Sequence, residues 1–198
     1  MRLLPTLLVG TALIATSAMA QPGGSDGHSI FRAAVGAGDG SLGLSCSGCS
    51  NNRTNGLAFM LRVGAAIAPD MIAAAEFTRW SRQVDAGTSS ASWAMAVLQD
   101  YPAASGGFYV KGGLGVAALD VFGVIQSTGV PYGLRTTNLG LEAGVGYDMR
   151  VARRVSVSPY VDFLYAVGAN PVLNLNQSTT GSNLGGNLLH VGLALSWR

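Results

Sequence analysis

The chain has 198 residues, of which 48% are hydrophobic and only 11% are charged, whereas about a quarter of the residues in an average soluble domain are charged. This composition excludes an intrinsically disordered chain, because disordered segments are rich in charge and poor in hydrophobic residues. The net charge of +2 is too small for the basic surface of a nucleic-acid-binding domain, so we expect no nucleic acid partner.

The first twenty residues have the pattern of a secretory signal peptide. Arg2 precedes an apolar stretch from Leu3 to Ile14, and Ala18 and Ala20 supply the small side chains of a cleavage site. We predict that residues 1–20 are removed on export, that 21–28 form a short periplasmic lead-in, and that 29–198 form one domain. No later stretch of about 20 apolar residues exists, which excludes a helical membrane protein.

After residue 28, large apolar residues alternate with small or polar ones, which is the period of a β-strand and not of a helix. The segment at 92–99 is the least clear, because Ala94, Ala96 and Leu98 are nearly as apolar as their neighbours Trp93, Met95 and Val97. Taken in chain order, the alternation predicts eight strands, near 29–38, 57–67, 72–81, 92–99, 107–117, 139–148, 155–165 and 189–197.

Six predicted strands each carry a charged residue on the face opposite their larger apolar residues. The rest of that face is mostly Gly, Ala and Ser, which is typical of an enclosed surface. A charge facing lipid at the bilayer midplane costs about 2–4 kcal/mol, so we expect all six charges to point inward. We therefore predict an all-β, eight-stranded antiparallel up-and-down transmembrane β-barrel, with a lumenal charge network of Arg32, Arg62, Glu76, Lys111, Glu142 and Asp162.

Long and short connections alternate along the predicted strands, and the long ones include 118–134 and 169–185. Membrane barrels have tight periplasmic turns and longer extracellular loops, so this alternation places both termini in the periplasm. Aromatic residues then fall near the two membrane interfaces, as in the aromatic girdles of such proteins. They are Phe108, Tyr147 and Trp197 on the periplasmic side and Phe163 and Tyr165 toward the other side.

Four segments combine glycine-rich strands, inward acidic residues and a final strand that ends in an aromatic residue. They are FYVKGGLGVA from 108, LGLEAGVGYDM from 139, SPYVDFLY from 158 and LLHVGLALSW from 188. Together they resemble the small outer-membrane β-barrel family that includes the OmpA-type and OmpX-type eight-stranded domains, over residues 29–198. The resemblance implies a location in the bacterial outer membrane, contact with its lipid, and insertion by the outer-membrane assembly machinery.

We expect a monomeric membrane-anchored scaffold and not an open pore, because eight strands enclose only enough space for side chains to fill. The inward charges are accordingly expected to form ion pairs and not an ion path. The long loops, rich in Gly, Ser, Thr and Asn, would serve structural or surface-interaction roles toward an extracellular partner that the sequence does not identify. We expect no enzymatic activity, no cofactor and no metal site.

Cys46 and Cys49 form a CSGC motif in the first long loop. In an exported protein this spacing predicts an intraloop disulfide. A redox motif would open a helix, and no helical pattern follows. A zinc site would need two further ligands, for which only His28 and His190 are available among the histidines.

Two other functions are consistent with parts of the sequence. A soluble, exported lipocalin-like barrel would carry an apolar ligand, and it would need its large apolar residues inside. A lipid A-modifying outer-membrane enzyme could use His190 and Asp162 with Ser158 or Ser196, which are the residue types of a hydrolytic triad. The face that holds the large apolar residues distinguishes the carrier from a membrane barrel.

Overall fold

The structure is a computed structural model that describes residues 31–45, 53–84, 87–103, 106–125, 130–169, 172–173 and 184–198. Residues 1–28 and the Cys46–Cys49 pair lie outside these ranges, so signal-peptide cleavage and the disulfide stay predictions. Among the described residues, no helix is long and apolar enough to cross a membrane. The elements are β1 (Phe31–Ser45), β2 (Arg53–Ala68), β3 (Met71–Val84), β4 (Gly87–Asp100), β5 (Phe108–Ile125), β6 (Val130–Tyr147), β7 (Met149–Arg150), β8 (Val155–Ala169), β9 (Val172–Leu173) and β10 (Leu184–Trp197).

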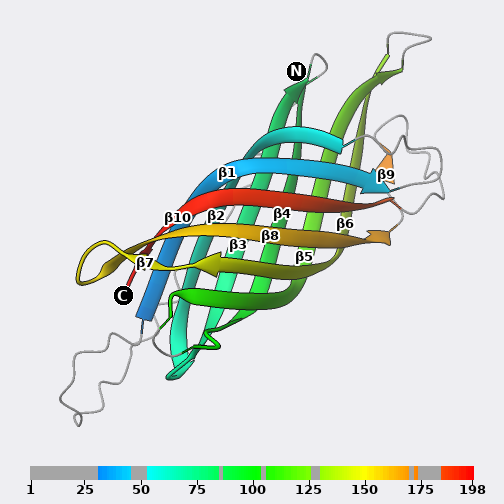
Figure 1. The fold of residues 1–198 in the computed structure, drawn as a ribbon. Coiled ribbons are helices and arrows are strands. Elements are labelled where there is room, and N and C mark those ends of the chain that lie inside the picture. The colour runs from blue at the N-terminus through cyan, green and yellow to red at the C-terminus, as the bar shows by residue number, and fades with distance from the viewer. Residues whose placement is uncertain are drawn as a thin grey trace, which may run out of the picture.

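Eight of these strands form one closed antiparallel barrel (Figure 1), as the alternation predicted. β1 to β6 pair in chain order, β8 pairs with both β6 and β10, and β10 closes the barrel on β1. The two-residue strands β7 and β9 pair with β8 and β6. Ala33 is the register partner of Trp197, so the first and last strands begin and end on the same side of the barrel.

The strands are longer than predicted on the side away from the termini. β5 and β6 stay in register from Phe108 and Tyr147 to Ile125 and Val130, so most of the predicted loop 118–134 is a β-hairpin (Figure 1). The predicted loop boundaries were wrong here for a physical reason. Apolar residues stand next to each other in Val121–Phe122 and Val124–Ile125, so the sequence shows no alternation there.

The outer face of the barrel wall is apolar. Large apolar side chains stand exposed on all eight long strands, and on β2 they follow one another at every second position from Leu57 to Val63. We call this surface the apolar belt. Its members include Val35, Leu57, Phe59, Leu61, Val63, Phe77, Leu98, Leu114, Val116, Leu139, Leu141, Val145, Val161, Phe163, Leu189, Val191, Leu193 and Leu195.

The interior away from the termini is filled by an apolar cluster that includes Trp80, Trp93, Leu164 and Leu188. The prediction that the inner face carries mostly small or charged residues was therefore wrong for this part of the barrel. Gly40 shows how the large side chains fit: the Trp80 indole donates a hydrogen bond to the Gly40 carbonyl at 2.9 Å, and a Cβ on Gly40 would lie 2.6 Å from the Trp80 ring. Small residues on one strand thus make room for a large side chain from another.

The ambiguous segment at 92–99 belongs to β4, whose large side chains also point into the barrel. Trp93, Met95 and Val97 are buried inside, whereas Ala94, Ala96 and Leu98 face outward. Side-chain size alone could not orient this strand, because its two faces are almost equally apolar.

Candidate functional site

Lys111 on β5 lies at the centre of a buried group of ionisable side chains. Its Nζ is 2.8 Å from Oε1 of Glu76, 2.5 Å from Oε1 of Glu142 and 2.9 Å from Oδ2 of Asp162. Nε of Arg62 is 2.6 Å from Oε2 of Glu76. The side chains of Lys111 and the three acids have 0% exposure. We call these five residues the lumen network.

Strand register brings the network together. Arg62 on β2 and Glu76 on β3 are direct cross-strand partners. Lys111 on β5 and Asp162 on β8 are both partners of Gly144 on the intervening strand β6. A Cβ on Gly144 would collide with Oδ1 of Asp162 and would lie 2.7 Å from Cε of Lys111. The missing side chain of Gly144 therefore leaves the space in which the two charges meet.

The network has the donor set of a cation site, and a lysine occupies its centre. Carboxylate oxygens of Glu76, Glu142 and Asp162 lie within 4.8 Å of one another, and the Lys111 ammonium contacts all three acids. The Lys111 ammonium donates hydrogen bonds to Glu76 and Asp162 and forms an ion pair with Glu142. Breaking a buried pair by removing one partner is strongly destabilising, so this arrangement can hold five strands together.

Arg32, the sixth charge assigned to the lumen, lies apart from this network. Its Nη1 is 3.4 Å from the hydroxyl of Tyr101, which follows β4 on the terminal side of the barrel. The Tyr101 hydroxyl donates to Oδ2 of Asp148 at 2.8 Å and accepts from Nε2 of Gln99 at 2.7 Å. We call Arg32, Gln99, Tyr101, Asp148 and Arg198 the terminal-side cluster, since Nη2 of Arg198 also lies 3.3 Å from Asp148.

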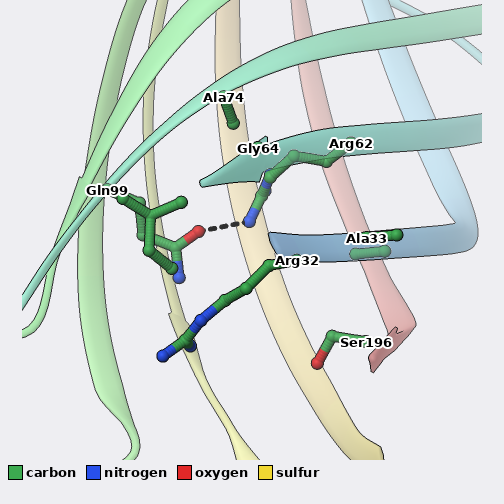
Figure 2. A pocket seen from close by; sticks show the side chains of 9 residues that line it. Arg32, Ala33, Arg62, Gly64, Ala74, Gln99 and Ser196 are labelled. Atoms are coloured by element: carbon green, nitrogen blue, oxygen red, sulfur yellow. Dashed lines mark hydrogen bonds between the residues drawn. The ribbon is translucent and has the colours of Figure 1, made fainter. Parts of the chain in front are cut away.

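Gln99 connects the two groups. Its Oε1 accepts a hydrogen bond of 2.5 Å from Nη1 of Arg62, as the dashed line in Figure 2 shows. Burial and the neighbouring Asp148 carboxylate both raise the pKa of Tyr101 above its ordinary value, because each disfavours a phenolate there. Sequence reasoning missed this cluster because Tyr101 falls in a predicted turn, where alternation carries no information. The inward parity of Gln99 at the end of β4 was the one available signal.

Comparison with solved structures places this geometry among known folds. The chain is similar to Neisserial surface protein A, with 16% identity, a TM-score of 0.55 and coverage of 84% of this chain and 97% of that one. It is similar to Ail of Yersinia pestis in complex with a heparin analogue, with 12% identity, a TM-score of 0.51 and coverage of 84% and 99%. It is also similar to the outer membrane protein OprG of Pseudomonas aeruginosa, with 14% identity, a TM-score of 0.48 and coverage of 87% of this chain and 98% of that one.

The chain has the fold of the small eight-stranded outer-membrane β-barrels. No protein-family model and no curated protein sequence matches it. At these sequence identities the likeness is one of fold, and what the other barrels bind is not thereby transferred to this chain.

This outer-membrane-type barrel does not assemble the possible hydrolytic triad. Nε2 of His190 lies 2.9 Å from the hydroxyl of Tyr160, and the Ser158 hydroxyl donates to Oδ1 of Asp148 at 2.5 Å. Asp162 is engaged by Lys111. The His190 side chain is fully buried, so its described contact with Tyr160 lies inside the lumen.

Proposed function

We propose that this protein spans the bacterial outer membrane as a closed anchor and presents its hairpins outside the cell for a structural or surface-interaction role. One observation carries the proposal: the barrel is apolar outside and ion-paired inside. Leu141, Val161 and Leu193 are 44%, 40% and 60% exposed, whereas Glu142 and Asp162 are 6% and 0% exposed. A soluble carrier with an apolar ligand requires the opposite arrangement.

The height of the apolar belt suits a bilayer. On β2 the belt extends from Leu57 to Ile67, ten steps of about 3.4 Å along a strand, or roughly 34 Å. With the strand tilt of about 35–45° usual for such barrels, this length corresponds to roughly 24–28 Å along the barrel axis, close to the apolar band of about 25 Å in outer-membrane barrels.

Outward-facing charges mark the edge of the apolar belt on the side away from the termini. Asp39 on β1 and Arg79 on β3 face outward like the residues of the apolar belt. Their register partners Leu57 and Phe59 lie at the edge of the belt away from the termini. Asp120 and Arg135 form an exposed pair of 3.6 Å beyond the belt on β5 and β6. Charges on the outer face thus begin where the apolar residues end, at the level proposed for the lipid headgroups.

The filled interior argues for an anchor and against a pore. The lumen network joins β2, β3, β5, β6 and β8 across the barrel, and the apolar cluster with Trp80 and Trp93 fills the interior beyond it. A continuous water path would have to displace ion pairs and then pass an apolar constriction. We therefore expect no steady ion conductance.

The β5–β6 hairpin is the described element best suited to act outside the cell. Beyond the Asp120–Arg135 pair its strands stay paired for five further register positions, or about 17 Å of strand. A paired hairpin offers a surface that is ordered before it meets a partner, which reduces the entropy cost of binding.

The proposal is tested by the topology of the protein in cells and by the conductance of the purified barrel. An epitope tag inserted between residues 127 and 128 is expected to bind antibody on intact cells, and a tag after Arg198 only after the outer membrane is permeabilised. Unheated protein from outer-membrane fractions should migrate differently from boiled protein and should give no open channel in planar bilayers. Protein recovered in the soluble periplasmic fraction, or a long-lived channel, would contradict the proposal.

A further inference from the structure

A cavity of about 30 Å³ lies inside the barrel between the lumen network and the terminal-side cluster (Figure 2). About 10–15 Å³ suffices for one water-sized occupant, so the space fits one or two small species. Its lining comes mainly from β1, β2, β3 and the end of β10, and its polar lining residues are Arg32, Arg62, Gln99 and Ser196.

Three polar groups of the lining residues are buried without a hydrogen-bond partner. They are Nη2 of Arg62, Nε of Arg32 and Oγ of Ser196. Arg62 is only 8% exposed, so bulk water does not satisfy its guanidinium. Buried polar groups in proteins almost always have a partner, and three such groups on three residues that line one cavity indicate that the cavity holds an occupant.

The chemistry of the lining selects the occupant. A guanidinium group donates hydrogen bonds and accepts none, so both arginines offer only donors. A water molecule there would have to donate its own two hydrogens to the second lone pair of Gln99 Oε1 and to the Ser196 hydroxyl, because Oε1 already accepts one hydrogen bond from Arg62. An anion accepts from every donor and has no hydrogen of its own to satisfy.

The charges on the two sides of the cavity differ in sign. Among the described residues no carboxylate forms a salt bridge with Arg32. The nearby Asp148 carboxylate pairs with Arg198 and accepts a hydrogen bond from Tyr101. The terminal-side cluster therefore holds two guanidinium groups and one carboxylate, whereas the lumen network holds two cations and three carboxylates. The side of the cavity that Arg32 lines is thus its positive side, where an anion would bind.

We propose that this cavity binds a halide-sized anion, such as chloride, between Arg32, Arg62 and Ser196. The site joins β1, β2 and β10, which include both strands of the closing seam, where Ala34 and Ser196 are register partners. The bound anion would therefore link the terminal-side end of this seam to Arg62 of the lumen network.

Crystals of the full barrel grown in sodium bromide test the proposal directly. An anomalous bromide peak is expected between the Arg32 and Arg62 guanidinium groups and the Ser196 hydroxyl. Density there without anomalous signal would identify a water molecule and overturn the proposal. So would a peak of equal height at this position in Arg32→Gln crystals, which would identify an adventitious ion only.

Thermal unfolding supplies the same test in solution. The unfolding midpoint of the folded barrel is measured as sodium bromide replaces sodium gluconate at constant ionic strength. Arg32→Gln should weaken the apparent bromide affinity about tenfold, the size of effect expected when one charge-assisted hydrogen bond is lost. Arg79→Gln, which removes an outward guanidinium far from the cavity, should leave the affinity unchanged.

Ser196→Ala keeps the proposal falsifiable if the Arg32 variant fails to fold. This substitution removes one of the three donors without changing charge, and it should also weaken bromide binding. Equal responses to bromide in the wild type and in the folded Ser196→Ala and Arg32→Gln variants would contradict the proposed site.

Discussion

Lys111 and Asp162 meet across an intervening strand. Nζ of Lys111 on β5 lies 2.9 Å from Oδ2 of Asp162 on β8, and both residues are register partners of Gly144 on β6. The contact exists because Gly144 has no side chain, and the lumen network can assemble around one lysine for the same reason.

The Gly144→Ala substitution should therefore destabilise the barrel. Its Cβ would collide with Asp162 and crowd Lys111, and overpacking of a filled interior costs about 1–3 kcal/mol. Urea unfolding in lipid vesicles measures the change. Gly112→Ala is the matched control, because a Cβ there meets only the Glu142 carbonyl oxygen, at 3.8 Å. Equal losses in the two variants would contradict a specific role for Gly144.

The Lys111→Met substitution should cost more. It leaves three buried carboxylates with Arg62 as their only cation among the network residues, and removing one member of a buried ionic group costs about 3–5 kcal/mol. The loss should become smaller at acidic pH, where the carboxylates take up protons. The same unfolding assay applies, with the exposed Arg150→Met as control. A loss below about 1 kcal/mol would show that the ion pairs do not hold the strands together.

Tyr101 should make the stability of the barrel depend on alkaline pH. Burial and Asp148 raise its pKa in the folded protein, so the folded state holds the phenolic proton more tightly than the unfolded state does. This contribution is fully present below the ordinary tyrosine pKa of about 10 and is lost as the pH rises through the folded pKa.

Unfolding free energies compared between pH 8 and pH 11 should thus fall more steeply for the wild type than for Tyr101→Phe. Tyr147→Phe, at an exposed position, should behave as the wild type does. Identical slopes for the wild type and Tyr101→Phe would rule out this effect.

Much of the lumen network could be predicted from the sequence, because a period of two fixes which face each residue occupies. That argument places Arg62, Glu76, Lys111, Glu142 and Asp162 on the inner face, where the structure has them. It could not tell which of them touch, because contacts depend on register, and register depends on where each hairpin turns. The separation of Arg32 from the other five is a consequence of register alone.

Residue size is a poor guide to the direction in which a side chain of this barrel points. Trp80 and Trp93 point inward because glycines such as Gly40 make room for them, and spatial complementarity between strands is not visible in the sequence of one strand. Arg79 shares the outward face with the apolar residues of β3, yet it lies at the end of the belt, where a charge meets headgroups and not hydrocarbon.

The apolar belt predicts a depth-dependent cost for outward charges. Leu141→Arg should destabilise the barrel by about 2–4 kcal/mol near the bilayer midplane. Thr137→Arg, on the same strand and the same outward face but beyond the belt, should cost about 1 kcal/mol or less. Both are measured by unfolding from lipid vesicles, and equal costs would show that lipid does not cover this face.

The most direct test of the inside-out arrangement is nuclear magnetic resonance of the barrel in lipid bilayers, with magnetisation transfer recorded from acyl-chain protons and from water. The account predicts transfer from acyl chains to the methyl groups of Leu141, Val161 and Leu193, and none to the side chains of Glu142 and Asp162. Transfer from water to those three methyl groups, with Glu142 and Asp162 also in contact with bulk water, would contradict it.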